Sequence, residues 1–355
     1  MPPCGRVHRR TFLADTGMGF TGLALGAMLA GDSPVRAADS NTWSLPSGLA
    51  RVAPRAKSVI WLFMIGGTSH LESFDPKPAV NKYQGLTIAE SPYNQRILES
   101  PFYRKNVRDF AGTPRKLMNR IYPLQVGYRK RGESGIEVSD WWPHLSSCID
   151  EIAVVRSMWT TDNDHAAQLQ FHTGRHIFDG FFPSIGSWVH YGLGSLNENL
   201  PQFLVLGTPP RDCCGGVGAH GADYLGPQHA GVQMRIDPKN PLPFGTPGAS
   251  VYQEERADQM ELLRELNGLA AIEYPGDAAM RARVKSYELA YRMQMAVPDV
   301  MNLDGETAAT RSLYGLDRDP TRRFGQQCLL ARRFVEKGVR FVQLYDGGWD
   351  AHSKL

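Results

Sequence analysis

Short runs of β-branched and apolar residues alternate with longer helical patterns, and this alternation limits the possible folds more than any other sequence feature. Strands are predicted over 58–65, 151–158, 202–207, 231–236 and 339–345, and the first, third and last runs are typical of strands buried on both faces. Helices are predicted over 166–173, 185–193, 254–269, 278–295 and 321–337. The pattern predicts an α/β fold with a mostly parallel central sheet flanked by helices.

Polar side chains follow three of these predicted strands directly. The groups are Thr68, Ser69, His70, Glu72 and Asp75; Thr160, Asp162, Asp164 and His165; and Asp346, Asp350 and His352. Ligands of open α/β sheets bind beyond the carboxyl ends of the strands, so these side chains are expected at one edge. Carboxylate and imidazole groups bind divalent metals, with zinc, manganese or calcium as the candidates here.

Each polar group also has a simpler interpretation. Asp75 precedes Pro76 and is typical of a turn, and Asp164 is a suitable N-cap for the helix that follows it. The repetition at three strand ends favours a metal site, as do the glycines that allow close backbone approach, namely Gly66, Gly67, Gly347 and Gly348.

Residues 1–37 predict an export signal. Arg9 and Arg10 precede a mildly apolar, glycine-rich run, and Val35 and Ala37 fit a peptidase cut after Ala37. Paired arginines favour the twin-arginine machinery, which exports folded proteins. We therefore expect a periplasmic or cell-envelope protein with no transmembrane span once the signal is removed.

Charge and cysteine content narrow the function classes further. The net charge is only +3 and is spread along the chain, so no nucleic-acid surface is expected. Beyond the signal the chain has Cys148, Cys213, Cys214 and Cys328, without the paired spacing of a structural zinc site. Cys148 and Cys328 either pair or stay buried as small apolar groups, and Cys213 and Cys214 receive no role.

A basic segment at about 79–135 lies between the first two predicted strands and is interpreted as an insertion. Its basic residues include Arg104, Lys105, Arg108, Arg115, Lys116, Arg120, Arg129, Lys130 and Arg131. Near a metal cleft they would attract sulfate, phosphate or acidic glycans. The alternative is a solvated surface excursion.

Several motifs in order resemble one exported family across nearly the whole chain. They are "KSVIWLFMIGGTSHLESFDPKP", "SGIEVSDWWPHL", "SIGSWVHYGLGS" and "CLLARRFVEKGVRFVQLYDGGWDAH", together with the twin-arginine signal. The family is the domain-of-unknown-function family numbered 1501, often labelled sulfatase-like. It is similar to the alkaline phosphatase and sulfatase superfamily, which hydrolyses phosphate or sulfate esters at a metal site.

The resemblance implies roles for individual residues. The helix that carries the nucleophile in the superfamily ends in Thr-Gly, here Thr173 and Gly174, which puts the nucleophile position on Asp164 with His165 beside it as ligand or general base. Asp350 and His352 match the later metal pair best, and His70, Glu72 or Asp75 would replace the usual first-strand aspartate. Ser69 and Arg175 are the expected substrate contacts.

The resemblance also implies an alkaline phosphatase-like domain over 38–355 that is incomplete at its carboxyl end, because related chains continue with further acidic and histidine motifs. The expected function is hydrolysis of a small-molecule or glycan sulfate or phosphate ester with a divalent metal. The alternative is a non-catalytic exported binding protein that retains the fold.

Overall fold

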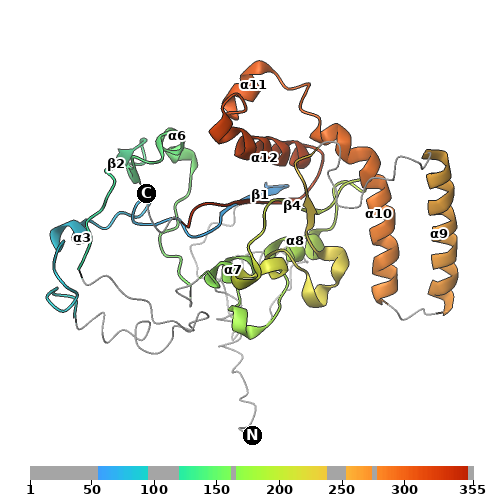
Figure 1. Ribbon diagram of the computed structural model, residues 1–355, viewed down its shortest axis with the longest axis horizontal. Coiled ribbons are helices and arrows are strands. Elements are labelled where there is room, and N and C mark those ends of the chain that lie inside the picture. Colours follow the sequence, from blue (N-terminus) through green and yellow to red (C-terminus); the bar gives the residue numbers. More distant parts are fainter. Residues whose placement is uncertain (1–54, 95–119, 161–164, 238–252, 274–277, 351–355) are drawn as a thin grey trace, which may run out of the picture.

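The computed structural model describes residues 55–94, 120–160, 165–237, 253–273 and 278–350 (Figure 1). Four parallel strands form the central sheet in the order β1 (Val59–Met64), β6 (Phe341–Asp346), β4 (Phe203–Gly207) and β5 (Val232–Met234). These strands and their flanking helices confirm the predicted α/β fold.

Helices cover both faces of the sheet (Figure 1). One face packs against α12 (Asp319–Glu336) and α10 (Ala278–Met301), in a core that includes Leu206, Leu330, Phe334 and Leu344. The other packs against α7 (Ala167–Thr173) and α8 (Ile185–Leu193), in a core with Leu169, Phe203 and Tyr345. β4 and β6 lie between the two layers, which explains their continuous apolar runs.

Local signals account for the ends of the helices that matter most for the site. Helix α7 ends at Thr173 because Gly174 adopts a left-handed conformation with φ of 72°, which a glycine reaches without steric cost. Helix α12 begins with Asp319 and Pro320, an acidic residue and a proline that both suit a first turn. Its polar and apolar residues then alternate with helical period, so one side faces the sheet.

The remaining helices and strands lie around this sheet. They are α3 (Pro78–Lys82), α6 (Pro143–Ser146), α9 (Gln253–Glu273), α11 (Ala308–Leu313) and an antiparallel pair, β2 (Tyr128–Arg131) with β3 (Ile136–Ser139). Short 3-10 turns are Ile149–Glu151, Ile177–Asp179, Asp212–Cys214, Gly216–Ala219, Asp223–Leu225 and Pro227–His229.

Two strand predictions are wrong. Residues 151–158 form no strand, and the Arg156 side chain instead donates hydrogen bonds to the carbonyls of Phe74 and Glu137, at 2.8 and 3.3 Å. β1 is not buried on both faces, since Leu62 is 56% exposed. β1 lies at the edge of the sheet, because it pairs only with β6 and has no second strand partner among the described residues. No strand from 151–158 lies beside it to help cover its side chains.

Neither Cys148 nor Cys328 forms a disulfide bond. Cys148 is exposed, whereas Cys328 packs against the core on the α12 side of the sheet. Burial raises the pKa of the Cys328 thiol to about 11, with a smaller contribution from Asp346. Cys328 therefore follows the buried, unpaired alternative, as a small apolar group.

The basic insertion is described only at its two ends. There Arg129 and Arg131 both form ion pairs with Asp140, at 2.8 and 2.7 Å. These ion pairs join β2 to the turn after β3. The predicted export signal over 1–37 and the other basic residues at 95–119 lie outside the described residues. In the described helices, no stretch is both long and apolar enough for a membrane crossing.

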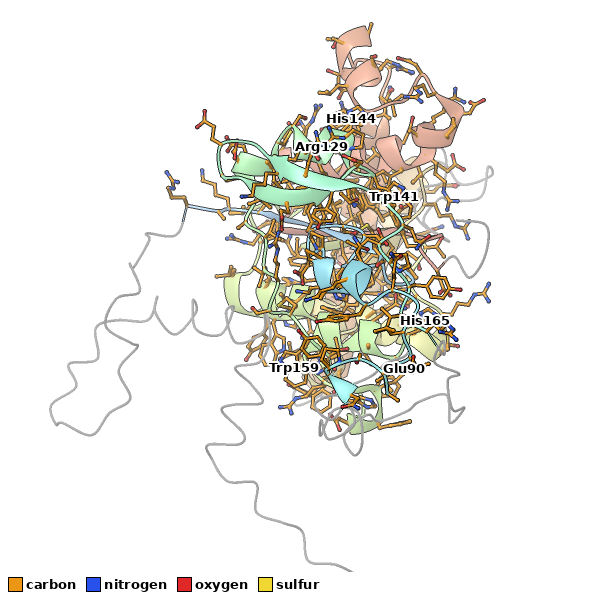
Figure 2. The ribbon with its side chains drawn as sticks, turned by 90° about the vertical axis from the view of Figure 1, so that its left-hand side faces the viewer. Glu90, Arg129, Trp141, His144, Trp159 and His165 are labelled. Atoms are coloured by element: carbon orange, nitrogen blue, oxygen red, sulfur yellow. The ribbon has the colours of Figure 1, made fainter. Side chains whose placement is uncertain are left out.

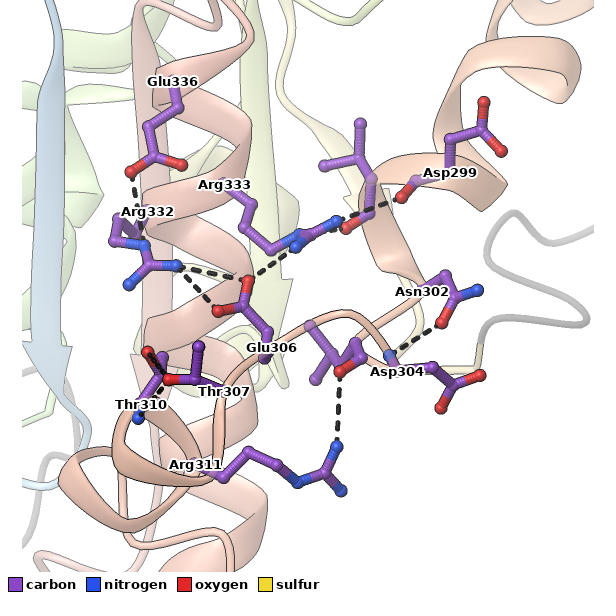
Figure 3. A network of polar contacts seen from close by, with 12 residues as sticks. Asp299, Asn302, Asp304, Glu306, Thr307, Thr310, Arg311, Arg332, Arg333 and Glu336 are labelled. Carbon is purple, nitrogen blue, oxygen red and sulfur yellow. Dashed lines mark hydrogen bonds and ion pairs between the residues drawn. The ribbon is translucent and has the colours of Figure 1, made fainter.

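Glu306 fixes the connection between α10 and α12 (Figure 3). Its carboxylate pairs with Arg333 and, at 3.2 Å, with Arg332. Arg333 also donates a 2.7 Å hydrogen bond from Nε to the carbonyl of Val300, near the end of α10. The Glu306 side chain is only 10% exposed, so these charge-assisted bonds are partly shielded from water.

A Glu306→Gln variant should be less stable by about 1–2 kcal/mol at neutral pH, because it loses bonds to two guanidinium groups. Hydrogen bonding from Arg333 lowers the pKa of Glu306 below its ordinary value of 4.5. The stabilisation is therefore complete above pH 4.5 and disappears as pH falls through the lowered pKa, so the deficit should shrink at pH 3. Urea unfolding at the two pH values measures this. Glu261→Gln, which removes an exposed pair with Arg264, is the control and should change stability by under about 0.5 kcal/mol.

Candidate functional site

The carboxyl ends of β1 and β6 meet at one edge of the sheet. The Ile65 amide donates to the Asp346 carbonyl at 2.8 Å, and the Trp349 amide donates to the Ile65 carbonyl at 3.3 Å. The indole Nε1 of Trp349 also donates to Asp346 Oδ2 at 2.8 Å. The loop after β6 therefore returns across the end of β1 and brings Asp350 to this edge.

His165 and Asp350 form a pair at this edge. The imidazole Nε2 lies 3.0 Å from Asp350 Oδ2, although the residues are far apart in the chain. The His165 and Asp350 side chains are 32% and 44% exposed, so the pair is open to solutes. Two of the predicted site residues are thus brought into direct contact, His165 from the start of α7 and Asp350 from the loop after β6.

A directional chain of hydrogen bonds orients His165. The Gly66 amide can only donate, so Gln168 accepts through Oε1 at 3.3 Å. Gln168 Nε2 then donates to His165 Nδ1 at 3.1 Å. His165 must carry its proton on Nε2, which donates to Asp350. Both ring nitrogens are used in this arrangement, which suits a role in positioning Asp350 rather than direct metal ligation.

Gly66 allows the close approach on which this geometry depends. Its φ of +116° is unfavourable for other residues, and a methyl group there would lie 2.6 Å from Asp350 Cβ and 2.9 Å from Asp350 Cα. The predicted role of glycine is therefore confirmed at Gly66. At Gly67, Gly347 and Gly348, a methyl group would have no neighbour within 4 Å among the described residues.

A cavity of about 750 Å³ lies beside this edge. It is lined by residues of three segments, Met64, Thr68, His70, Ser73, Phe74 and Asp75; Ile152, Ala153, Val154, Val155, Arg156, Met158, Trp159 and Thr160; and Phe171. The structure therefore brings His70 and Asp75 together with the segment that precedes His165. Residues 151–158 line this cavity instead of forming the predicted strand.

The predicted ligands in the loop after β1 differ in their surroundings. His70 is exposed, and its backbone carbonyl accepts from the amides of Ser73 and Asp75. The Asp75 carboxylate lies 2.7 Å from Lys77 Nζ and 3.9 Å from Arg156 Nε, so two cations already balance its charge. Glu72 accepts from the amides of Gln125 and Val126, at 2.7 and 3.1 Å, and so joins this loop to the segment before β2.

The two predicted substrate contacts occupy different places. Ser69 Oγ accepts a weak 3.4 Å bond from the Glu72 amide, and Ser69 itself is exposed in the loop after β1. Arg175 follows α7, and its guanidinium lies 5.3 Å from the centre of the Phe182 ring. Ser69 is therefore in the same loop as His70, while Arg175 is at the opposite end of α7 from His165.

Three stacked rings support the loop that carries Asp350. Trp349 stacks on Trp142 at 5.6 Å with nearly parallel planes, and Trp142 stacks on Phe74 at 5.7 Å. Figure 2 looks onto this end of the molecule, with Trp141 near the β2–β3 hairpin and Trp159 and His165 below it. The stack links loops after β1, β3 and β6, and the sequence alone did not reveal it.

Another histidine on α7 is buried behind the site. His172 Nδ1 bonds to Gln343 Nε2 at 3.0 Å, and Phe63 lies 4.4 Å from the imidazole centre. Burial lowers the pKa of His172 to about 3, and His220 adds to the effect. His172 thus stays neutral at physiological pH and helps to hold α7 on the sheet.

Sequence reasoning missed Gln168, which orients His165. A glutamine three residues after a histidine lies on the same face of a helix, so this spacing was a usable signal. Asp164 and His352 lie outside the described residues. Among residues that are described, no three histidine, cysteine, aspartate or glutamate side chains form a group able to hold a metal. The described aspartates at this edge are Asp346, which accepts from the Trp349 indole, and Asp350, which lies 3.0 Å from His165 Nε2.

Comparisons with known proteins give one match. A family model described as "Protein of unknown function (DUF1501)" matches residues 56–355. Neither the curated proteins nor the solved structures include a match to the chain.

Proposed function

Because the chain belongs to the DUF1501 family, whose description assigns no function, we propose a function from its own residues: an exported, metal-dependent hydrolase of sulfate or phosphate esters. The main support is the His165–Asp350 pair at the carboxyl edge of a parallel sheet, where α/β proteins bind ligands. We also propose that the fold is related to that of alkaline phosphatases and sulfatases.

The described residues divide the work as follows. Asp350 offers a carboxylate whose orientation is set by His165, Gln168 and the Gly66 amide. A divalent metal held by Asp350, with His352 and His70 as further candidate ligands, would supply positive charge to the ester oxygens. The neighbouring cavity, lined by both apolar and polar side chains, would receive the organic part of the ester.

Hydrolysis of such an ester joins a water oxygen to phosphorus or sulfur and breaks the bond to the ester oxygen, which leaves with a proton. In the proposal, Asp164 holds the nucleophile position implied by the family: its carboxylate attacks phosphorus or sulfur as the ester oxygen leaves and takes up a proton. Water then hydrolyses the resulting mixed anhydride and restores Asp164. His165 is its neighbour in sequence. His165 acts as a positioning residue, because its Nε2–H donates to Asp350 in the described arrangement.

We expect Asp350→Ala to lower turnover of chromogenic sulfate or phosphate esters by at least ~100-fold, since it removes the central carboxylate. His165→Ala should lower turnover by ~10–100-fold through loss of orientation. Elemental analysis of protein purified without chelators should show stoichiometric zinc, manganese or calcium that Asp350→Ala reduces. The control is Asp317→Ala, which removes an exposed acid remote from this loop in sequence. Wild-type turnover and metal content in Asp350→Ala would refute the proposal.

A second candidate is a non-catalytic exported binding protein. It is favoured by Trp141 and Trp159, which are 51% and 48% exposed at the same end of the molecule. Exposed indole rings are suited to stacking on sugars. A metal-free protein that binds a glycan array but hydrolyses none of the esters would support this candidate over the hydrolase.

A further inference from the structure

A second cavity, of about 400 Å³, lies at the carboxyl ends of β4 and β5, against α12. Its lining residues are Gly207, Thr208, Gln233, Met234, Arg235, Ile236, Arg323, Gln326 and Gln327. β6 separates β4 from β1, and the lining helix is α12 rather than α7. This cavity is therefore distinct from the His165–Asp350 edge.

The lining is rich in hydrogen-bond donors and has an unbalanced positive charge. It contains Arg235 and Arg323 and no aspartate or glutamate. Neither guanidinium makes an ion pair or hydrogen bond to another side chain within the described residues, although Arg322, next to Arg323, pairs with Asp319 at 2.6 Å. Two unneutralised arginines beside one cavity attract anions, and a guanidinium matches the geometry of an oxyanion.

Gln327 provides an independent sign that this cavity is a binding site. The residue is 3% exposed, and its amide oxygen has no hydrogen-bond partner among the described residues. An unused buried acceptor costs free energy, and it is satisfied by a donor such as a water molecule or the hydroxyl of a protonated oxyanion. A methyl group on Gly207 would lie 3.3 Å from Gln327 Nε2. The Gln327 amide therefore lies next to the end of β4, where the residue has no side chain.

We propose that this cavity binds inorganic phosphate, whose charged oxygens accept hydrogen bonds from Arg235 and Arg323 and whose P–OH group donates to the unused amide oxygen of Gln327. Thr208 adds a hydroxyl donor at the end of β4. The site does not depend on the proposed hydrolase function, because binding to it requires neither metal nor turnover.

Isothermal titration with sodium phosphate, at ionic strength held constant with sodium chloride, tests this site. Sodium sulfate, which has no proton to donate to Gln327, should bind more weakly than phosphate. Relative to wild type, Arg323→Gln and Arg235→Gln should each weaken binding ~10-fold, and the double variant should abolish it. Both arginines are exposed, so these variants should keep the fold, which circular dichroism checks. Arg318→Gln, which removes an equal charge at the start of the same helix, should bind within about 2-fold of wild type.

The Asp350→Ala variant separates the two sites. Undiminished phosphate binding in Asp350→Ala, with loss in the double arginine variant, supports the second site even when no ester is hydrolysed. Three outcomes overturn it: no binding by wild type at ~10 mM anion, equal weakening by Arg318→Gln, or loss in Asp350→Ala but not in the double arginine variant.

Discussion

A Gly66→Ala variant is expected to lose ~3 kcal/mol or more of stability and at least ~100-fold of any ester hydrolysis. The new methyl group would lie 2.6 Å from Asp350 Cβ, which is closer than carbon atoms approach without strain. The positive φ of +116° adds a backbone cost that a glycine avoids. Relief of the clash must move Asp350 away from His165 or distort the end of β1.

Gly67→Ala is the matched control for this substitution. Gly67 also has a positive φ, of +88°, but a methyl group there would have no neighbour within 4 Å among the described residues. It should therefore show only the backbone cost, about 1–2 kcal/mol, and keep most of the activity. Chemical unfolding and ester turnover measure both variants. Equal effects of the two substitutions would show that the contact with Asp350 has no importance.

A Phe334→Ala variant is expected to lose about 3–5 kcal/mol of stability, the typical cost of removing a fully buried aromatic ring. Phe334 is completely buried on α12, in the core that includes Leu206 and Leu344 from the sheet. Removal of the ring would leave a cavity beside β4 and β6, which contribute those residues. Both strands are packed on both faces, so they cannot shift to fill the cavity without disturbing the opposite layer.

Phe324→Ala tests whether this cost reflects burial rather than loss of helix propensity. Phe324 is on the same helix, but its ring is 38% exposed, so its removal should cost below about 1 kcal/mol. Thermal unfolding by circular dichroism compares the two variants. Losses of the same size at both positions would contradict the described core.

Hydrophobic periodicity predicted helices and strands correctly where the element packs against the sheet. Helix α8 begins and ends at the predicted residues, and β4 and β6 come from the runs predicted to be strands buried on both faces. Periodicity failed at 151–158, where an apolar run faces a cavity instead of a strand neighbour. Hydrophobicity alone cannot separate these cases, because both bury the same kinds of side chain.

The site was predicted in part. The polar loops after β1 and β6 were expected at one edge because parallel strands end there together, and the bond from the Trp349 amide to the Ile65 carbonyl joins these two strand ends. His165 contacts Asp350 from a segment that follows no strand, because the strand predicted over 151–158 does not form. Gln168 and the ring stack of Phe74, Trp142 and Trp349 were not foreseen. Each depends on which way a side chain points after distant loops have packed.

The amino-acid sequence by itself determined the α/β class, most helices, the four runs that form the sheet, the burial of β4 and β6, and the loops that carry polar groups, because local periodicity encodes burial. Only the tertiary structure decided that β6 lies between β1 and β4, that His165 donates to Asp350, and that Arg235 and Arg323 share a cavity. Strand order and side-chain partners arise from packing between segments far apart in the chain, and no local pattern specifies such long-range contacts.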